Sequence, residues 1–397
     1  MDLVKRLFPG LCALALTACD GGMPGGPDVD HLHVHSADNE VTSLAVTTDG
    51  ASLHVLWVET DEDDQVRAYH SRSEDGGQDW SAPVALDTGQ APPNRVQRSN
   101  DIRVAAHGET LLAVWQTRGD GFANSGPMVT ARSEDGGRSW EAAVNPGQPG
   151  DSASQGFFDL QADPEGRFHL VWLDNRGGQQ GLHHARSDDD GRTWSGVSTL
   201  DAATCQCCWN TMRHAGDGSW VLYRDLSPRD MALAASADGG DNWKATGTVG
   251  AFDWIVDGCP HVGGGLALTG DRPRLHALVW TGEEKALGLY YLEADGQDPV
   301  WSAPRRMGSR DARNSSLASH RDGQLIAAWD DGGADARVYL ALRVDDRWSA
   351  ESIVSDAGVR ARHPLVLVTE HGAHVFWTQR SGDLPGTWAG ARTRFPE

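Results

Sequence analysis

Four of the six cysteines of this chain lie in two short segments, Cys205-Gln-Cys-Cys-Trp209 and Asp257-Gly-Cys259-Pro-His261. In an oxidising compartment an even number of thiols favours disulfides, so we expect two bridges among these four cysteines. Because Cys207 and Cys208 are adjacent, each is expected to pair with a different partner. The four cysteines would then hold loops in place. The residues of this expectation are Cys205, Cys207, Cys208 and Cys259.

The same thiols allow two other kinds of chemistry. Thiolates are soft ligands that suit Cu(I) or Zn(II), and His261 could add a nitrogen ligand to them. The other alternative is redox chemistry at the thiols. The spacing Cys-x-Cys-Cys is not that of a standard zinc knuckle, so disulfides without a cofactor are the favoured interpretation. A Cu or Zn site is the alternative, with the ligands Cys205, Cys207, Cys208, Cys259 and His261.

Paired arginines and aspartates surround the cysteine segments in the sequence. They occur in Asp174-Asn-Arg176, Arg224-Asp225 and Arg229-Asp230. Arginine binds carboxylate, sulfate or phosphate in a bidentate geometry, and tryptophan offers a flat apolar face to a sugar ring or a partner. The competing interpretation is that many of these charges only pair with one another. We predict a ligand-binding face made of Arg176, Trp209, Arg224, Arg229, Trp254 and His261, with Asp174, Asp225 and Asp230 as candidate catalytic acids.

Three histidines alternate near the start of the chain, at His31, His33 and His35. On a β-strand they would share one face and could hold a metal ion. A solvated polar face of an outer strand is the favoured interpretation.

An eight-residue phrase recurs four times and indicates the elements that must position these residues. Its Asp accepts backbone N–H groups inside a hairpin turn, its Gly adopts the left-handed conformation, and its Trp closes over the hairpin. This Ser-x-Asp-x-Gly-x-x-Trp pattern resembles the Asp box, or BNR repeat, of the sialidase-like β-propellers. The resemblance implies that the repeats lie on the outer rim, away from any ligand. The four copies are Ser73–Trp80, Ser133–Trp140, Ser187–Trp194 and Ser236–Trp243.

A second repeat gives the number of blades. Strand-like runs that end in an aromatic residue occur seven times, and the seventh unit is one strand short. Residues 30–36 alternate polar and apolar side chains and can supply the missing strand. We therefore predict an all-β, seven-bladed β-propeller closed by its N-terminal strand; six blades, as in sialidases, is the alternative. The runs are Leu53–Trp57, Leu111–Trp115, Phe168–Trp172, Trp220–Tyr223, Leu275–Trp280, Leu325–Trp329 and His374–Trp377.

The blade pattern places further arginines in the connections between blades. Connections of adjacent blades emerge on one face near the central channel, so the two cysteine segments should also be neighbours in space. Arginines gathered on such a face of an acidic protein favour a clamp for an anion. They are Arg95, Arg98, Arg310, Arg313, Arg360 and Arg362.

Sialidase activity would require more than the fold. The resemblance implies three arginines that hold a carboxylate, an Asp acid, and a Tyr nucleophile paired with a Glu. No Arg-Ile-Pro signature occurs near the first blade, and none of the five tyrosines follows the expected loop context. Cys-x-Cys-Cys followed by Asp-Gly-Cys-Pro-His is similar to a subgroup of exported bacterial BNR-repeat proteins, which implies a shared site in blades four and five. A binding module is therefore favoured over an exo-sialidase-type glycoside hydrolase, and a thiolate metal-binding protein is the second alternative.

The first residues indicate export. Lys5 and Arg6 precede an apolar run from Leu7 to Leu16, and Leu16-Thr-Ala-Cys19 resembles a bacterial lipobox. We expect a signal peptide at residues 1–18, lipidation of Cys19, a flexible tether at 19–29 and the propeller at 30–397; an ordinary signal peptide is the alternative.

The charge and hydropathy of the chain narrow its partners. The formal net charge is −22 at pH 7, which argues against nucleic acid and against anionic membranes as partners. No later apolar stretch approaches the ~18 residues of a membrane span, so the lipid would be the only anchor. The expected location is the bacterial cell envelope, and the expected partner is a glycan, an anionic small molecule or an envelope protein.

Overall fold

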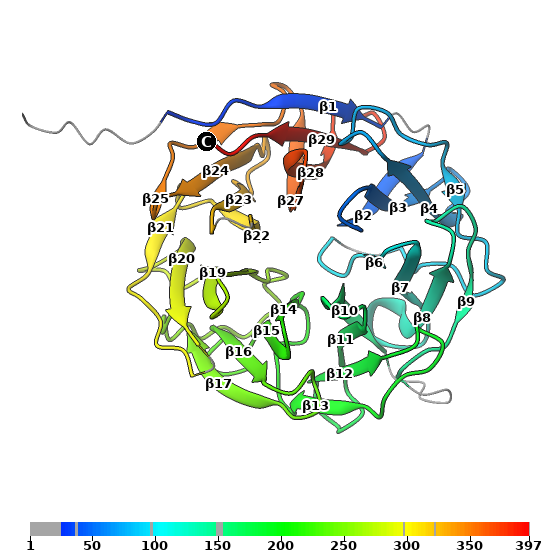
Figure 1. Cartoon of the computed structure of the whole chain (residues 1–397), viewed down its shortest axis with the longest axis horizontal. Coiled ribbons are helices and arrows are strands. Elements are labelled where there is room, and N and C mark those ends of the chain that lie inside the picture. The colour runs from blue at the N-terminus through cyan, green and yellow to red at the C-terminus, as the bar shows by residue number, and fades with distance from the viewer. Residues whose placement is uncertain are drawn as a thin grey trace, which may run out of the picture.

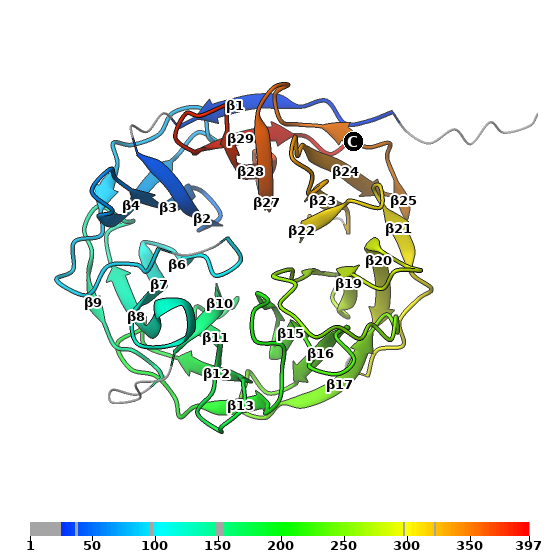
Figure 2. The same cartoon turned by 180° about the vertical axis from the view of Figure 1, so that it is seen from behind.

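Seven antiparallel sheets are arranged around a central axis in the computed structural model (Figure 1). The structure describes residues 25–35, 39–95, 98–147, 154–296, 298–320 and 323–396. Viewed from behind, the same ring of sheets is seen (Figure 2). The prediction of a seven-bladed β-propeller is confirmed, and the six-bladed alternative is wrong.

In blades one to five, neighbouring strands follow one another in the chain. The first three blades contain β2 (Glu40–Thr48), β3 (Leu53–Thr60), β4 (Val66–Ser73) and β5 (Val84–Ala85); β6 (Arg103–His107), β7 (Thr110–Arg118), β8 (Ser125–Ser133) and β9 (Glu141–Ala143); and β10 (Gly156–Ala162), β11 (Phe168–Asp174), β12 (Gly181–Ser187) and β13 (Ser198–Asp201). A short 3-10 turn, η1 (Phe122–Asn124), interrupts blade two. Blades four and five contain β14 (Thr211–Ala215), β15 (Gly218–Arg224), β16 (Met231–Ser236) and β17 (Lys244–Val249); and β18 (Gly265–Thr269), β19 (Arg274–Thr281), β20 (Gly288–Asp295) and β21 (Arg305–Met307). Blade six contains β22 (Arg313–Ser319), β23 (Leu325–Asp330), β24 (Val338–Val344), β25 (Arg347–Trp348) and β26 (Ser352–Ile353), and blade seven β27 (Arg360–Thr369), β28 (Gly372–Arg380), β29 (Thr387–Thr393) and β1 (Asp30–Val34).

The last blade is closed by the N-terminal strand, as the sequence predicts. Strand β1 pairs antiparallel with β29, with Asp30 opposite Arg392 and Val34 opposite Ala389, and the two lie side by side in Figure 1. His35 continues the pairing by donating its backbone N–H to Trp388 O over 2.9 Å. Closure removes the exposed strand edges that promote aggregation.

The alternating histidines of this segment have different neighbours. A register shift separates His31 from His33 in the pairing with β29. His31 is exposed beside Asp356, whereas the His35 ring stacks on Trp388 at 5.5 Å between centroids. The side chain of His33 lies outside the described residues. His31 and His35 therefore face different surroundings, so a metal site on one shared strand face has no support.

The Asp-box phrases form turns of the expected kind. In the first copy, Asp75 Oδ1 accepts the backbone N–H groups of Gln78 and Asp79 over 2.9 and 3.0 Å. Trp80 Nε1 donates to Gly77 O over 3.1 Å, which closes the turn. In the second copy, a Cβ added to Gly137 would lie 2.0 Å from the His70 ring. Glycine is required there by both its positive φ and this close approach.

The hydrophobic core lies mainly between adjacent blades. The tryptophans of the middle strands, such as Trp172 and Trp329, are almost fully buried there. Trp220, on β15 of blade four, is likewise buried and belongs to the core cluster shared with β18–β20 of blade five. In each blade the innermost strand begins and the second strand ends on the same side of the ring, because successive strands are antiparallel. The connections on that side, together with the strand ends that join them, form what we call the top face, and they include every predicted site residue of the folded body.

The predicted signal peptide and Cys19 lie outside the described residues, as does most of the tether. Among the described residues, no helix is both long and apolar enough to cross a membrane.

Candidate functional site

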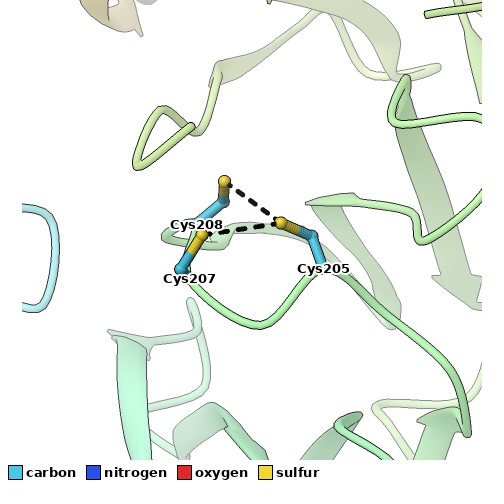
Figure 3. A group of neighbouring side chains, drawn as sticks. All are labelled: Cys205, Cys207 and Cys208. Carbon is cyan, nitrogen blue, oxygen red and sulfur yellow. Dashed lines mark hydrogen bonds between the residues drawn. The ribbon is translucent and has the colours of Figure 1, made fainter. Parts of the chain in front are cut away.

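The two cysteine segments meet on the top face. Cys205, Cys207 and Cys208 lie in the connection from β13 to β14, and Cys259 and His261 lie in the connection from β17 to β18. The sulfurs of Cys207 and Cys208 point toward that of Cys205 (Figure 3), at 3.8 and 3.5 Å. The donor atoms of Cys207, Cys259 and His261 also lie within 4.8 Å of one another. Blade topology thus brings the two segments together, as the sequence predicts.

None of these four cysteines is bridged in the structure. The sulfur separations of 3.5 and 3.8 Å exceed the ~2.05 Å of a disulfide bond. Cys205, Cys207 and Cys208 are buried, whereas Cys259 is exposed. The structure places three buried, unbridged sulfurs in one group, and the two disulfides stay a prediction.

The three buried thiols differ in acidity. Hydrogen bonds from the Cys207 and Cys208 thiols, helped by the charge of Arg229, lower the pKa of Cys205. The hydrogen bond to Cys205 raises the pKa of Cys207. Burial raises the pKa of Cys208, although Arg224 opposes that rise. The arrangement stabilises one thiolate, on Cys205, beside two protonated thiols.

Arg224 and Arg229 are built into the wall of this sulfur cluster. Arg224 is 1% exposed and donates to Val262 O over 3.0 Å and Trp280 O over 2.9 Å. Its guanidinium lies 5.3 Å from the Trp254 ring centroid. Arg229 Nη1 donates to Cys205 Sγ over 3.1 Å. Within the described part of the chain, neither arginine forms an ion pair with a carboxylate.

The three candidate acids are occupied by nearby groups. Asp174 accepts from Trp172 Nε1 over 2.7 Å and lies 3.0 Å from His183 Nε2. Although burial opposes it, His183 and Arg176 hold the pKa of Asp174 well below its usual value. Asp230 Oδ2 accepts the backbone N–H groups of Phe252 and Asp253 over 2.9 and 2.8 Å. Both carboxylates are buried and organise their loops.

Asp225 differs from the other two acids. It is half-buried, and burial raises its pKa. Its Oδ1 accepts the N–H of Leu226 over 2.6 Å, and its backbone pairs with Thr204. It does not line either cavity described below.

A basic cavity of about 200 Å³ lies beside the sulfur cluster on the top face. Its lining includes three arginines and two histidines, which come from two connections and from the first residues of two inner strands. We call it the basic cavity. Those residues are Arg98, Arg313, Arg362, His261 and His363.

The arginines of the basic cavity have free donors. Arg98 Nη2, Arg313 Nε and Arg362 Nε are buried and lack a hydrogen-bond partner among the described residues. Arg98 Nε lies 3.0 Å from Asp101 Oδ1, but Arg313 and Arg362 bond only to backbone carbonyls. Burial lowers the pKa of Arg98 and of Arg313. The cavity therefore concentrates positive charge that the described protein groups neutralise only in part.

Asp330 accepts hydrogen bonds from two residues that line the basic cavity, Asn314 and His363. Burial raises its pKa to about 6, although hydrogen bonds from His363 N and Asn314 oppose that rise. Asn314 Nδ2 donates to both carboxylate oxygens, at 3.1 and 2.9 Å. Asp330 thus orients Asn314, which lines the cavity.

A second cavity, of about 130 Å³, occupies the central channel. It shares Arg98, Asn314 and His363 with the basic cavity and is also lined by Trp209 and Asp159. None of the five tyrosines lines either cavity.

The predicted ligand-binding residues divide between these places. Trp209 lines the channel and His261 lines the basic cavity. Four others line neither cavity. Arg176 pairs with Asp174, Arg224 and Arg229 lie beside the sulfur cluster, and Trp254 packs against Arg224.

The three cavity arginines are predicted from the sequence only as members of a larger set, and Asn314 and His363 are not predicted at all. Arg98 lies five residues before β6, Arg313 begins β22 and Arg362 is the third residue of β27. Position relative to the start of an inner strand is the signal that could have selected them, because those starts surround the channel.

Comparisons with known proteins agree with this architecture. The profile of the BNR repeat-like domain matches residues 33–266. No curated protein matches the chain. Among solved structures, an ulvan lyase bound to a glucuronate–sulfated rhamnose unit is similar with a TM-score of 0.61 at 10% identity, covering 90% of this chain and 95% of that one.

Two further solved structures are similar in fold. The polysaccharide lyase Uly1 has a TM-score of 0.54 at 11% identity, with 96% of this chain and 94% of that chain covered. The Trypanosoma rangeli sialidase in complex with sialic acid has a TM-score of 0.51 at 11% identity, with 94% and 60% covered. At these identities the likeness concerns the fold.

Proposed function

The chain belongs to the BNR repeat-like family, and on this sialidase-like propeller we propose that the basic cavity binds an anionic glycan through its carboxylate or sulfate groups. One observation carries the proposal: Arg98, Arg313 and Arg362 line one cavity, and among the described residues only Arg98 pairs with a carboxylate. An anion bound in this cavity would supply the counter-charge that Arg313 and Arg362 lack.

The adjoining channel suits the rest of a sugar chain. Trp209 and Asp159 line it, and it shares Arg98 with the basic cavity. A tryptophan face packs against sugar rings, while an arginine clamp selects for the acidic unit. The similar solved structures bound to sialic acid or to a glucuronate-containing unit support a glycan over other anions.

Binding without cleavage is the favoured form of this activity. Among the groups that line the cavities, Asp101 and Asp159 already accept hydrogen bonds from neighbouring strands, and no tyrosine is present. The alternative is a glycoside hydrolase of the exo-sialidase type. A 4-methylumbelliferyl sialoside should show little or no turnover. Robust hydrolysis of the sialoside by the parent protein would make the protein an enzyme.

Calorimetric titration tests the binding proposal with matched probes. We expect 3′-sialyllactose or a glucuronate-containing oligosaccharide to bind more tightly than neutral lactose, with affinity falling as salt increases. Arg362→Met should weaken binding by about 10-fold or more, since hydrogen bonds to charged groups contribute about 1.5–3 kcal/mol. Arg360→Met is the control, because Arg360 is exposed two residues away on the same strand. Equal affinities for acidic and neutral sugars would refute the proposal.

We also propose that the propeller works at the bacterial cell envelope, held there by a lipid on Cys19. The basic pair Lys5-Arg6, the apolar run and the Leu16–Cys19 phrase support this placement. A Cys19→Ser variant should move from the membrane fraction to the soluble fraction. Retention of that variant in the membrane fraction would count against lipidation.

A further inference from the structure

Five sulfur and nitrogen donors form two overlapping triangles on the top face. One consists of Cys205, Cys207 and Cys208, and the other of Cys207, Cys259 and His261; within each, the donor atoms lie within 4.8 Å of one another. Cys207 belongs to both. We propose that the first triangle binds a thiophilic d10 metal ion, Cu(I) or Zn(II), through its three sulfurs. The binding of an anionic glycan does not depend on this site.

The sulfur spacing matches a metal site better than a bridged pair. A metal–sulfur distance of about 2.3 Å in tetrahedral geometry puts the sulfurs about 3.8 Å apart. The measured separations from Cys205 Sγ are 3.8 Å to Cys207 and 3.5 Å to Cys208. The three sulfurs need to move little to hold one ion.

The surrounding charge also favours a metal–thiolate centre. Arg224 and Arg229 are next to the triangle, and neither is paired with a carboxylate in the described part of the chain. A buried cation without a counter-charge is unfavourable. Cu(I) bound by three thiolates has a net charge of −2, which these two arginines neutralise; Zn(II) with the same ligands has −1. The balance favours Cu(I). Binding releases the protons of the thiols that were not already ionised.

The second triangle places a further ligand beside the first. His261 Nδ1 is buried and has no hydrogen-bond partner among the described residues. Cys259 is exposed, so this side of the site faces solvent and offers an entry path for the ion. His261 also lines the basic cavity, so the metal site and the proposed glycan site adjoin each other.

The experiment uses the reduced mature protein and the metals alone. Cu(I) is titrated in competition with bicinchoninate, Zn(II) in competition with 4-(2-pyridylazo)resorcinol, and native mass spectrometry gives the stoichiometry. We expect one tightly bound ion per chain, with Cu(I) bound more tightly than Zn(II). Cys207→Ser and Cys208→Ser should each weaken binding by more than the roughly 100-fold that loss of a ligand's hydrogen-bonding partner costs.

Two control variants separate the triangle from other donors. Cys259→Ser should keep one tightly bound ion, because it breaks only the second triangle. His31→Asn should bind as the parent does, since His31 is exposed elsewhere. If a serine variant fails to fold, the parent protein still gives an answer: bound metal should slow the alkylation of Cys205, Cys207 and Cys208 relative to the metal-free reduced protein, while Cys259 reacts in both.

Three results would overturn the proposal. The first is a reduced protein that binds both metals no more tightly than Cys207→Ser does. The second is loss of the tightly bound ion in Cys259→Ser, which would move the site to the other triangle. The third is intact mass showing two disulfides that can be reduced only by unfolding the protein.

Discussion

Arg229 donates a hydrogen bond to Cys205 Sγ over 3.1 Å, across two connections of the top face. Its own backbone N–H donates to Trp254 O over 2.7 Å, so Arg229 also joins the connection after β17. One arginine therefore links the cysteine segment to both neighbouring loops and places a positive charge on a sulfur. Loss of the Arg229 side chain should therefore change the acidity of the Cys205 thiol more than it changes the stability of the fold.

Removing the charge of Arg229 should raise the pKa of Cys205. The thiolate of Cys205 is stabilised by hydrogen bonds from Cys207 and Cys208 and by the charge of Arg229. In reduced protein, Arg229→Met should shift the thiolate absorbance near 240 nm to higher pH, whereas Arg229→Lys should shift it less. An unchanged pH profile in Arg229→Met would contradict the role assigned to this contact.

The Asp-box tryptophans should contribute to stability and not to binding. Trp140 is half-buried and packs against the core between blades one and two. Trp140→Ala should lower the free energy of unfolding by about 2–4 kcal/mol, near or below the range for buried aromatic residues. Phe122→Ala is the control, since Phe122 is 93% exposed. Urea unfolding measures the effect, and a selective loss of glycan affinity at unchanged stability would oppose the prediction.

Stability should fall as the pH drops below about 6.5, because buried histidines are held neutral. Burial lowers the pKa of His70 to about 3 and those of His276 and His374 to about 4. The unfolded chain binds these protons at about pH 6.5. The folded-state pKa is the lower one, so the stabilisation is complete above pH 6.5 and is lost as pH falls toward 4 and 3.

Urea unfolding between pH 7.5 and 4.5 measures this dependence. His276→Gln should reduce the slope by up to about 1.4 kcal/mol per pH unit, the value for one proton. The two ring nitrogens of His276 form hydrogen bonds with Thr269 and Tyr291 inside blade five. Glutamine can replace part of this hydrogen bonding. A flat profile in the parent protein would refute the prediction.

The closing strand should be necessary for a stable monomer. A chain that begins at Glu40 lacks β1 and exposes the edge of β29, which favours aggregation. We expect a lower melting temperature and larger species in size-exclusion chromatography. A chain that begins at Gly25 keeps β1 and the bond from Thr393 Oγ1 to Asp28 O at 2.6 Å, and should match the parent. Equal behaviour of both truncated chains would show that closure by β1 is dispensable.

The architecture could be predicted from the sequence alone, because its turns and repeats depend on residues that are close together in the chain. Ser73–Trp80 and its three copies carry their turn within eight residues, so neighbouring groups decide their shape. The repeated strand-plus-aromatic runs set the number of blades, and the short seventh unit required a strand from residues 30–36. The nearness of Cys207 and Cys259 followed as well, since adjacent blades repeat the same connection.

The partners of individual charges were decided only by the tertiary structure. Asp230 is a candidate acid in the sequence, yet it accepts the backbone N–H groups of Phe252 and Asp253, more than twenty residues away. Asp174 pairs with its neighbour Arg176, but His183 on the next strand also holds it. Arg98 meets Arg313 and Arg362 only because the ring closes and turns the starts of distant inner strands toward one channel. A turn depends on neighbours in the chain, whereas burial and the choice of ion-pair partner depend on which distant segments pack together.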